Sequence, residues 1–142
     1  DVEEQLDDHA MGMVVFSPLA GGVLTGKYND GIPEGSRGSQ YGSGWLSDNF
    51  ADDRISKARQ LTDVAQEYGY ELSALALAWA LHHPGVDSVI TGATKPSHVE
   101  SNIKALDVTL SSDLEKKIED ILQNRPYNSR RAVMTADEHA AI

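Results

Sequence analysis

The stretch MVVFSPLAGGVLTGKY, residues 13–28, joins a short apolar run to a turn rich in glycine. Gly12 and Pro18 flank the apolar run, which favours a buried β-strand over residues 13–16. A segment rich in Gly, Ser, Asn and Asp then continues to residue 49, and a loop of this length inside a compact domain is usually functional or disordered. The stretch therefore predicts a strand that leads into a long loop with a functional role.

Helices alternate with a second strand in the rest of the chain. Apolar residues spaced by three and four predict an amphipathic helix over residues 52–68, which Gly69 ends. Residues 73–82, SALALAWALH, are apolar on nearly every side and predict a helix packed between other elements. A second strand over residues 86–91 leads through small residues into a helix over residues 96–105.

A last helix is predicted to begin at Ser112, where Ser112 and Glu115 form a capping box. The alternation of strands and helices predicts parallel strands with covering helices. Two strands do not close a sheet, and a (β/α)8 barrel needs eight strands and about 250 residues. The predicted fold class is therefore α/β, namely the C-terminal part of a TIM barrel that is incomplete on its own. It comprises the last two β/α units and a C-terminal helix.

Composition limits the classes of partner. The chain has 142 residues, a formal net charge of -10 and no cysteine. The acidic surface disfavours nucleic acid and anionic lipid, and the lack of cysteine excludes disulfides and thiolate metal sites and fits a cytoplasmic location. No apolar run approaches the roughly 20 residues of a membrane helix. The acidic start without Met suggests a chain cut from something longer, so we expect a fragment, a truncated product or half of a split protein.

Part of the glycine-rich loop matches the pattern G-x-x-x-x-G-K of a triphosphate-binding loop, from Gly21 to Lys27. Tyr28 stands where that loop needs a hydroxyl for magnesium, and a turn follows in place of a helix. The match therefore does not predict a triphosphate site.

Cations and small residues nevertheless follow both predicted strands. Lys27 and Arg37 lie in the long loop, and the second strand ends in Gly92 and Thr94 with Lys95 beside them. Parallel α/β folds bind ligands outside the carboxyl ends of their strands. Two such turns suggest one elongated phosphate ligand, such as a dinucleotide. From the residues alone, ordinary tight turns with solvated lysines remain the alternative.

Several motifs in this order resemble the aldo-keto reductase family. They are VVFSPLAGGVLTGKY, GIPEGSR, LALAWALHHPGVDSVITGA and GATKPSHVESN. The nearest branch contains voltage-gated potassium channel β subunits and related bacterial oxidoreductases, which ILQNRPY near the end also resembles. The resemblance covers roughly residues 10–128. It predicts a partial domain over residues 1–128, followed by a loose tail over residues 129–142.

The family implies a barrel that binds NADPH and transfers hydride to a carbonyl substrate. Carried onto this chain, it implies that Phe16 stacks on the nicotinamide ring. Thr25 and Lys27 would contact phosphate, and Arg37 would close over the cofactor from a lid loop. The pyrophosphate path would be lined by Ser17, Pro18, Leu19, Ala20 and Gly21.

The same resemblance places the adenosine end at the second turn. Gly92 and Thr94 would meet the 2′-phosphate, and Asn102 would contact adenine. His98 stands where the family often has Gln or Arg, and a histidine is shorter and changes charge near neutral pH. Ser101 stands where the family usually has Glu, which removes or weakens one adenine contact.

The family's catalytic Asp, Tyr, Lys and His lie on early barrel strands that this chain does not resemble, so no catalytic or metal-binding residue is predicted. The chain would supply cofactor contacts to an NADPH-dependent oxidoreductase, with a homo-oligomer or a missing N-terminal half of the barrel as partner. A nucleotide-sensing or partner-binding module and an inactive remnant are the alternatives. We also expect the isolated chain not to bind NADPH, because Leu75, Leu77 and Trp79 would lack their usual neighbours.

Overall fold

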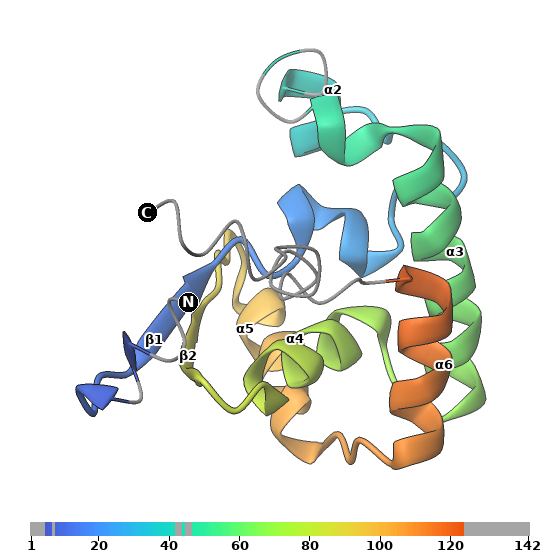
Figure 1. Cartoon of the computed structure of the whole chain (residues 1–142). Coiled ribbons are helices and arrows are strands. Elements are labelled where there is room, and N and C mark those ends of the chain that lie inside the picture. The colour runs from blue at the N-terminus through green and yellow to red at the C-terminus, as the bar shows by residue number, and fades with distance from the viewer. Residues whose placement is uncertain (1–4, 7, 42–43, 45–46, 124–142) are drawn as a thin grey trace, which may run out of the picture.

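Two parallel strands lie at one side of a group of helices (Figure 1). The computed structural model describes residues 5–6, 8–41, 44 and 47–123. Strands β1, Met13–Phe16, and β2, Val86–Ile90, pair in parallel with Phe16 opposite Ile90. Both predicted strands and their parallel arrangement are confirmed. The helices between them make the crossover that a parallel pair requires.

The segment between β1 and the first long helix contains regular structure that the sequence did not predict. It forms a 3-10 helix at Ala20–Thr25, helix α2 at Arg37–Tyr41 and a second 3-10 helix at Ser47–Phe50. The prediction of one long loop is therefore wrong in part. Each of these elements is too short to display a hydrophobic period, so pattern reading misses them.

Helix α3, Asp52–Glu67, ends at the glycine that the sequence predicted. Gly69 has a φ of 78°, a left-handed conformation that glycine adopts without steric cost. The N–H of Gly69 donates to the carbonyl of Gln66 at 3.0 Å, and the N–H of Tyr70 donates to that of Ala65 at 2.8 Å. These two bonds form a Schellman motif, which satisfies carbonyls that the helix end would leave without partners.

Helix α4, Leu72–His82, lies at the centre of the molecule and contacts α3, β2 and α5 (Figure 1). Leu75 and Leu77 are each 2% exposed, and Trp79 packs against the core while its Nε1 donates to Glu119 at 3.2 Å. The prediction that α4 is buried on nearly every side is confirmed. These three side chains do have neighbours within this chain, since Leu75 and Trp79 pack in the core with α3 and α6, and Leu77 packs with Ala105, Leu19 and Val89.

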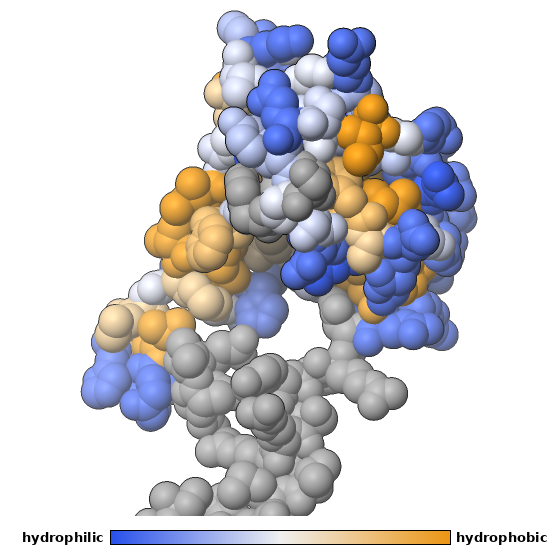
Figure 2. Space-filling model, turned by 90° about the horizontal axis from the view of Figure 1, so that it is seen from above, coloured by the Kyte–Doolittle hydropathy of each residue, from blue (hydrophilic) through white to orange (hydrophobic). Residues whose placement is uncertain are grey.

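Part of the exposed apolar surface lies on the sheet. Val14 is 58%, Phe16 79% and Ile90 59% exposed, and Figure 2 shows apolar side chains gathered on the side of the molecule where the strands lie. Helix α4 packs against β2. Parallel sheets normally have both faces covered. The described fold is thus a helix-rich α/β domain with a short parallel sheet, consistent with part of a barrel.

The last elements are α5, Pro96–Ile103, a 3-10 helix at Lys104–Asp107, and α6, Ser112–Leu122. Ser111, not Ser112, is the N-cap of α6, since its Oγ accepts from the N–H of Leu114 at 3.3 Å. The predicted capping box of Ser112 and Glu115 is therefore wrong: the cap lies one residue earlier, and Leu114 at the third helical position has no side-chain acceptor to complete a box. Two adjacent serines offer the same hydroxyl, and only the backbone, extended at Ser111, decides between them.

Helix α6 is fixed to α3 by an apolar face and by exposed polar contacts. Leu114 and Ile118 are buried in the same core as Leu75. Lys117 pairs with Glu67 at 2.7 Å, and the Tyr68 hydroxyl donates to Asp113. This hydrogen bond and the Lys117 ammonium hold the pKa of the Asp113 carboxyl below its ordinary value.

No helix within the described ranges combines the length and the apolar character needed to cross a membrane. The predicted tail, residues 129–142, lies outside the described residues.

Candidate cofactor-binding site

Both strands end at the same edge of the sheet. Phe16 and Ile90 are register partners in a parallel pair, so the chain leaves β1 at Ser17 and β2 at Thr91 side by side. All the cofactor-binding residues predicted from the sequence lie at Phe16 or after one of these two exits. The topology therefore brings both predicted turns to one edge, where ligands of parallel α/β folds bind.

The ring of Phe16 projects from the open face of the sheet. It is 79% exposed and shares this face with Val14, two residues earlier on the strand. An exposed aromatic face at the end of a strand provides a flat apolar surface on which a planar ring can stack. This is the chemistry that the resemblance assigns to the position.

The turn that follows β1, which is the first of the two turns, has an unusual backbone. Ser17 and Ala20 have φ values of 56° and 49°, and Gly21 has a φ of 68°. A left-handed conformation is uncommon for residues other than glycine and tends to occur at functional sites. Hydrogen bonds hold the turn: the N–H of Ala20 donates to Ser17 at 3.0 Å, and that of Gly22 donates to Leu19 at 2.8 Å. Pro18 and Leu19 complete the predicted pyrophosphate path, and both are half-buried.

Thr25 and Lys27 take part in the structure of the same turn. The Thr25 hydroxyl donates to the carbonyl of Gly22 at 2.8 Å and accepts from the N–H of Lys27 at 3.4 Å. The Lys27 side chain folds back over Gly22, where a Cβ atom would lie 2.9 Å from Nζ. Its ammonium lies 4.9 Å from the centre of the Tyr28 ring. Lys27 thus presents a positioned cation that pairs with no carboxylate among the described residues.

Tyr28 is a structural residue that sequence reasoning used only as evidence against a triphosphate loop. It is 2% exposed, and its hydroxyl accepts from the N–H of Gly38 at 3.0 Å. Its ring meets Phe50 edge to face at 4.9 Å. These contacts fix the start of α2, where Arg37 is exposed and makes no ion pair with a described residue. An aromatic residue among the glycines and polar residues of the loop was the signal that could have identified this anchor.

The turn that follows β2, which is the second of the two turns, is open to solvent. Residues 91–100 are all exposed, and no atom lies within 4 Å of the position of a Cβ on Gly92. The His98 Nδ1 lies 3.4 Å from the backbone nitrogen of Thr94 and 3.5 Å from its Oγ1. Asn102 is half-buried on α5. No described hydrogen bond or ion pair joins this turn to the first one.

Ser101, the departure from the family pattern, is engaged inside the protein. Its hydroxyl donates to Oε2 of Glu71 at 2.6 Å, while Lys104 pairs with Oε1 of the same carboxylate at 2.6 Å. The hydrogen bonds from Lys104 and then Ser101 hold the pKa of Glu71 below its ordinary value. Glu71 precedes α4, so these bonds fix α5 against the central helix.

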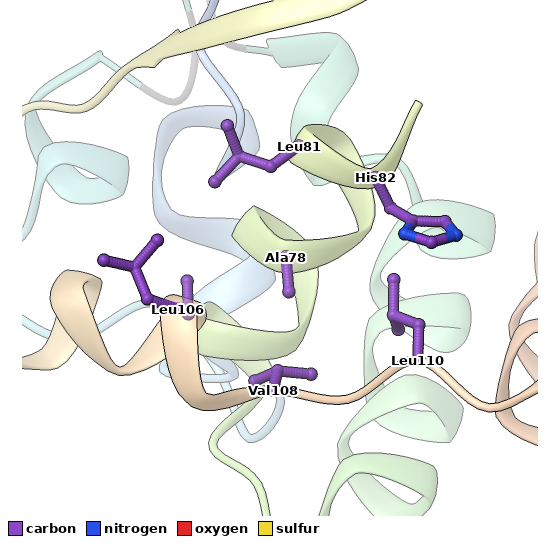
Figure 3. Close-up of a pocket in the computed structure, with 7 residues that line it drawn as sticks. Ala78, Leu81, His82, Leu106, Val108 and Leu110 are labelled. Atoms are coloured by element: carbon purple, nitrogen blue, oxygen red, sulfur yellow. The ribbon is translucent and has the colours of Figure 1, made fainter. Parts of the chain in front are cut away.

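One hollow, of about 220 Å³, lies away from the predicted residues (Figure 3). Its lining comes from the C-terminal part of α4 and from the segment between α5 and α6, and is largely apolar. It contains Ala78, Leu81, His82, Ala105, Leu106, Val108 and Leu110. His82 also pairs with Glu115 at 3.0 Å. Within the described ranges, no group of three His, Asp or Glu side chains is placed to hold a metal ion.

Comparison with known proteins agrees with the resemblance in the sequence. The model of the aldo/keto reductase family matches residues 2–123. A probable voltage-gated potassium channel subunit beta of Arabidopsis thaliana is 43% identical over 123 residues, which cover 84% of this chain and 38% of the relative. A probable subunit beta of Oryza sativa subsp. japonica is 43% identical over 122 residues, which cover 83% of this chain and 37% of that relative. The chain thus spans under two fifths of the length of these relatives, and it belongs to the aldo/keto reductase family.

Proposed function

We propose that this chain forms the cofactor-binding portion of an NADPH-dependent oxidoreductase that reduces carbonyl compounds. The observation that carries the proposal is the common sheet edge, where an exposed Phe16 and the two turns leave the strands together. The donor set suits a dinucleotide phosphate. It combines the ammonium of Lys27, which pairs with no described carboxylate, with an open turn at Gly92.

Each part of the edge has a distinct task in this proposal. Phe16 orients the nicotinamide by stacking, and the turn from Ser17 to Gly21 follows the pyrophosphate. Lys27 and Arg37 offset phosphate charge, and the second turn holds the adenosine end with its 2′-phosphate. NADPH, when bound, supplies a hydride. The chain itself binds and orients the cofactor, and the proton donor comes from the rest of the barrel.

A partner or a preceding segment is part of the same proposal. Both strands of the described sheet have an unpaired edge, and one apolar face is exposed. Such edges demand a neighbouring strand. We assign this place to the N-terminal strands of the barrel, on the same chain or on another, with a second copy of this chain as the alternative occupant. The lack of cysteine supports a cytoplasmic location.

NADPH fluorescence tests the site on the purified chain. The burial of Leu75 and Leu77 removes the ground for expecting no binding by the isolated chain. We expect saturable binding with a Kd below about 1 mM, as a site with part of its contacts would give. Phe16→Ala should weaken binding about tenfold, the loss of roughly 1.4 kcal/mol of stacking.

Val14→Ala is the matched control, because Val14 is also exposed, lies on the same strand and faces the same way. It should leave the NADPH affinity unchanged. Equal losses in both variants would show a general effect on the sheet and contradict stacking at Phe16. No fluorescence change up to about 1 mM NADPH would contradict a site formed by this chain alone.

A second candidate function is a nucleotide-sensing or partner-binding module. The names of the relatives, as subunits of potassium channels, favour it. A chimera in which this chain replaces the matching 123 residues of the Arabidopsis relative separates the two functions. NADPH-dependent carbonyl turnover favours the oxidoreductase, whereas NADPH binding without turnover favours the sensor.

A further inference from the structure

The ring of Tyr28 lies between two glycines, one at each edge. A Cβ atom on Gly38 would lie 2.8 Å from Cε1 of the ring, and a Cβ atom on Gly22 would lie 3.4 Å from Cε2. The Tyr28 hydroxyl also accepts from the N–H of Gly38 at 3.0 Å. Gly22 belongs to the turn that follows β1, whereas Gly38 belongs to α2. Tyr28 thus joins two backbone segments that are separate in the sequence.

Two cations lie at this junction. The ammonium of Lys27 is 4.9 Å from the centre of the Tyr28 ring, and Arg37 directly precedes Gly38 in the chain. Neither cation forms an ion pair with a carboxylate of the described residues. The chain has 22 acidic residues against 12 Lys and Arg. In so acidic a protein, two such cations around one ring favour an anionic ligand at this place.

We propose that Tyr28 is a positioning residue for the cofactor phosphates, which fixes Arg37 relative to Lys27 without contacting the ligand itself. The inference rests on the proposed function, since it concerns the same phosphates. Tyr28 is 2% exposed, which leaves almost no surface for contact with a ligand. It acts through two separate contacts. The ring attracts the ammonium of Lys27, and the hydroxyl holds the backbone beside Arg37.

These contacts reduce the ordering that binding would otherwise require. A segment that becomes ordered only when the ligand binds lowers the affinity. The Tyr28 hydroxyl removes this cost in advance for the backbone beside Arg37. Loss of the hydroxyl should therefore weaken binding through Arg37, and it should leave the contribution of Lys27, which uses the ring, as it was.

A double-mutant cycle in the full chain tests this inference, with NADPH fluorescence as the measure of Kd. Tyr28→Phe keeps the ring and removes the acceptor, so it should raise Kd about threefold. Arg37→Gln should raise Kd about tenfold, because a charged contact with phosphate is lost. We expect the double variant to stay at about tenfold, since without Arg37 the hydroxyl has no cation to position.

Lys27→Gln provides the contrast within the same site. Combined with Tyr28→Phe, it should give the product of the two single effects, because the ring beside Lys27 is retained. Tyr70→Phe is the matched control, since its hydroxyl also accepts a backbone N–H, that of Thr109 in the segment before α6. It should leave Kd unchanged. A purely structural role for Tyr28 would not distinguish Arg37 from Lys27.

A measurement on the wild type does not depend on how well the variants fold. Hydrogen exchange of the Gly38 amide, followed by NMR, should slow when NADPH binds, because engagement of Arg37 stabilises the backbone beside it. The Thr109 amide, which also donates to a tyrosine hydroxyl, should slow less. Equal slowing of both amides would show general stabilisation by the ligand and contradict positioning by Tyr28.

The outcomes separate this inference from the proposed function. If NADPH binds the wild type but the effects of Tyr28→Phe and Arg37→Gln multiply, then Tyr28 does not act through Arg37. The inference then fails while the cofactor site stands, and the same holds if Arg37→Gln leaves Kd unchanged. If the wild type binds no NADPH up to about 1 mM, then the proposed site fails and this inference fails with it.

Discussion

Helices α3, α4 and α6 differ from the two strands in how far their apolar residues are buried. Helices α3, α4 and α6 bury Leu61, Leu75 and Leu114 against one another, whereas the strands leave Phe16 and Ile90 more than half exposed. Burial of apolar area is the main source of folding free energy. The comparison teaches that these helices hold the structure together, whereas the sheet leaves apolar side chains exposed.

The largest expected effect separates these two regions directly. Leu75→Ala should lower the free energy of unfolding by about 3 kcal/mol, because it empties a fully buried position. Phe16→Ala should change it by less than about 0.5 kcal/mol, since its ring is 79% exposed. Urea denaturation followed by circular dichroism measures both. A cost at Phe16 comparable to that at Leu75 would mean that the sheet face is covered in solution.

Tyr28 lies in a smaller core cluster with Val23 and Ala58. Tyr28→Phe should cost about 1–2 kcal/mol, because the buried N–H of Gly38 loses its acceptor. Tyr70 makes the matched bond, as its hydroxyl accepts from the N–H of Thr109 at 3.2 Å in an exposed setting. Tyr70→Phe should therefore cost less than about 0.5 kcal/mol, since water can replace the hydroxyl. If Tyr28→Phe and Tyr70→Phe lower the free energy of unfolding equally in the same denaturation assay, then burial of the hydrogen bond does not determine its contribution.

At the N-terminal end of α6, a substitution should have a smaller effect on stability. Ser111→Ala should cost about 1 kcal/mol through loss of the N-cap hydrogen bond. The neighbouring Ser112→Ala should cost much less, because Ser112 lies inside the helix and alanine favours a helix. Thermal unfolding of the two variants decides between the residues. The reverse order would restore Ser112 as the cap.

The smallest effect depends on pH and concerns the join between α4 and α5. Lys104 and Ser101 lower the pKa of Glu71 from 4.5, so the carboxylate stabilises the fold above that value. This stabilisation is lost as the pH falls through the lowered pKa. The wild type should thus lose up to about 1 kcal/mol relative to Glu71→Gln between about pH 6 and about pH 3, a small value because the pair is exposed.

Urea denaturation at the two pH values measures this difference. Glu100→Gln is the control, because Glu100 lies on α5 without an ion pair to a described residue, and it should leave the pH dependence unchanged. If the wild type loses as much stability relative to Glu100→Gln as relative to Glu71→Gln, then the effect comes from net charge and not from the contact between α4 and α5.

Much of the fold could be predicted because local patterns determine it. The spacing of apolar residues predicted α3, and the apolar character of residues 73–82 predicted the burial of α4 on most sides. Gly69 predicted the end of α3. The 3-10 helices and the cap at Ser111 could not be predicted, because they depend on backbone angles that several sequences permit.

The candidate site also has features that could be predicted from the sequence and features that could not. Strand order and the positions of the two turns predicted that Phe16 and Gly92 belong to one edge of the sheet. The contacts that occupy polar side chains could not be predicted. Ser101 donates to a carboxylate 30 residues away, and no local pattern indicates such a partner. The role of each site residue toward a cofactor stays a prediction.

The pairing of β1 with β2 has a consequence for the order in which the chain folds. The N–H of Met13 bonds the carboxylate of Asp87 across 74 residues, where β1 first meets β2. Closing so long a loop costs chain entropy before any contact offsets it. The helical hairpin of α3 and α4 needs no such closure, so it can form early and serve as a template. On a ribosome, β1 is therefore made before α3 and α4, and its partner β2 is made only after them.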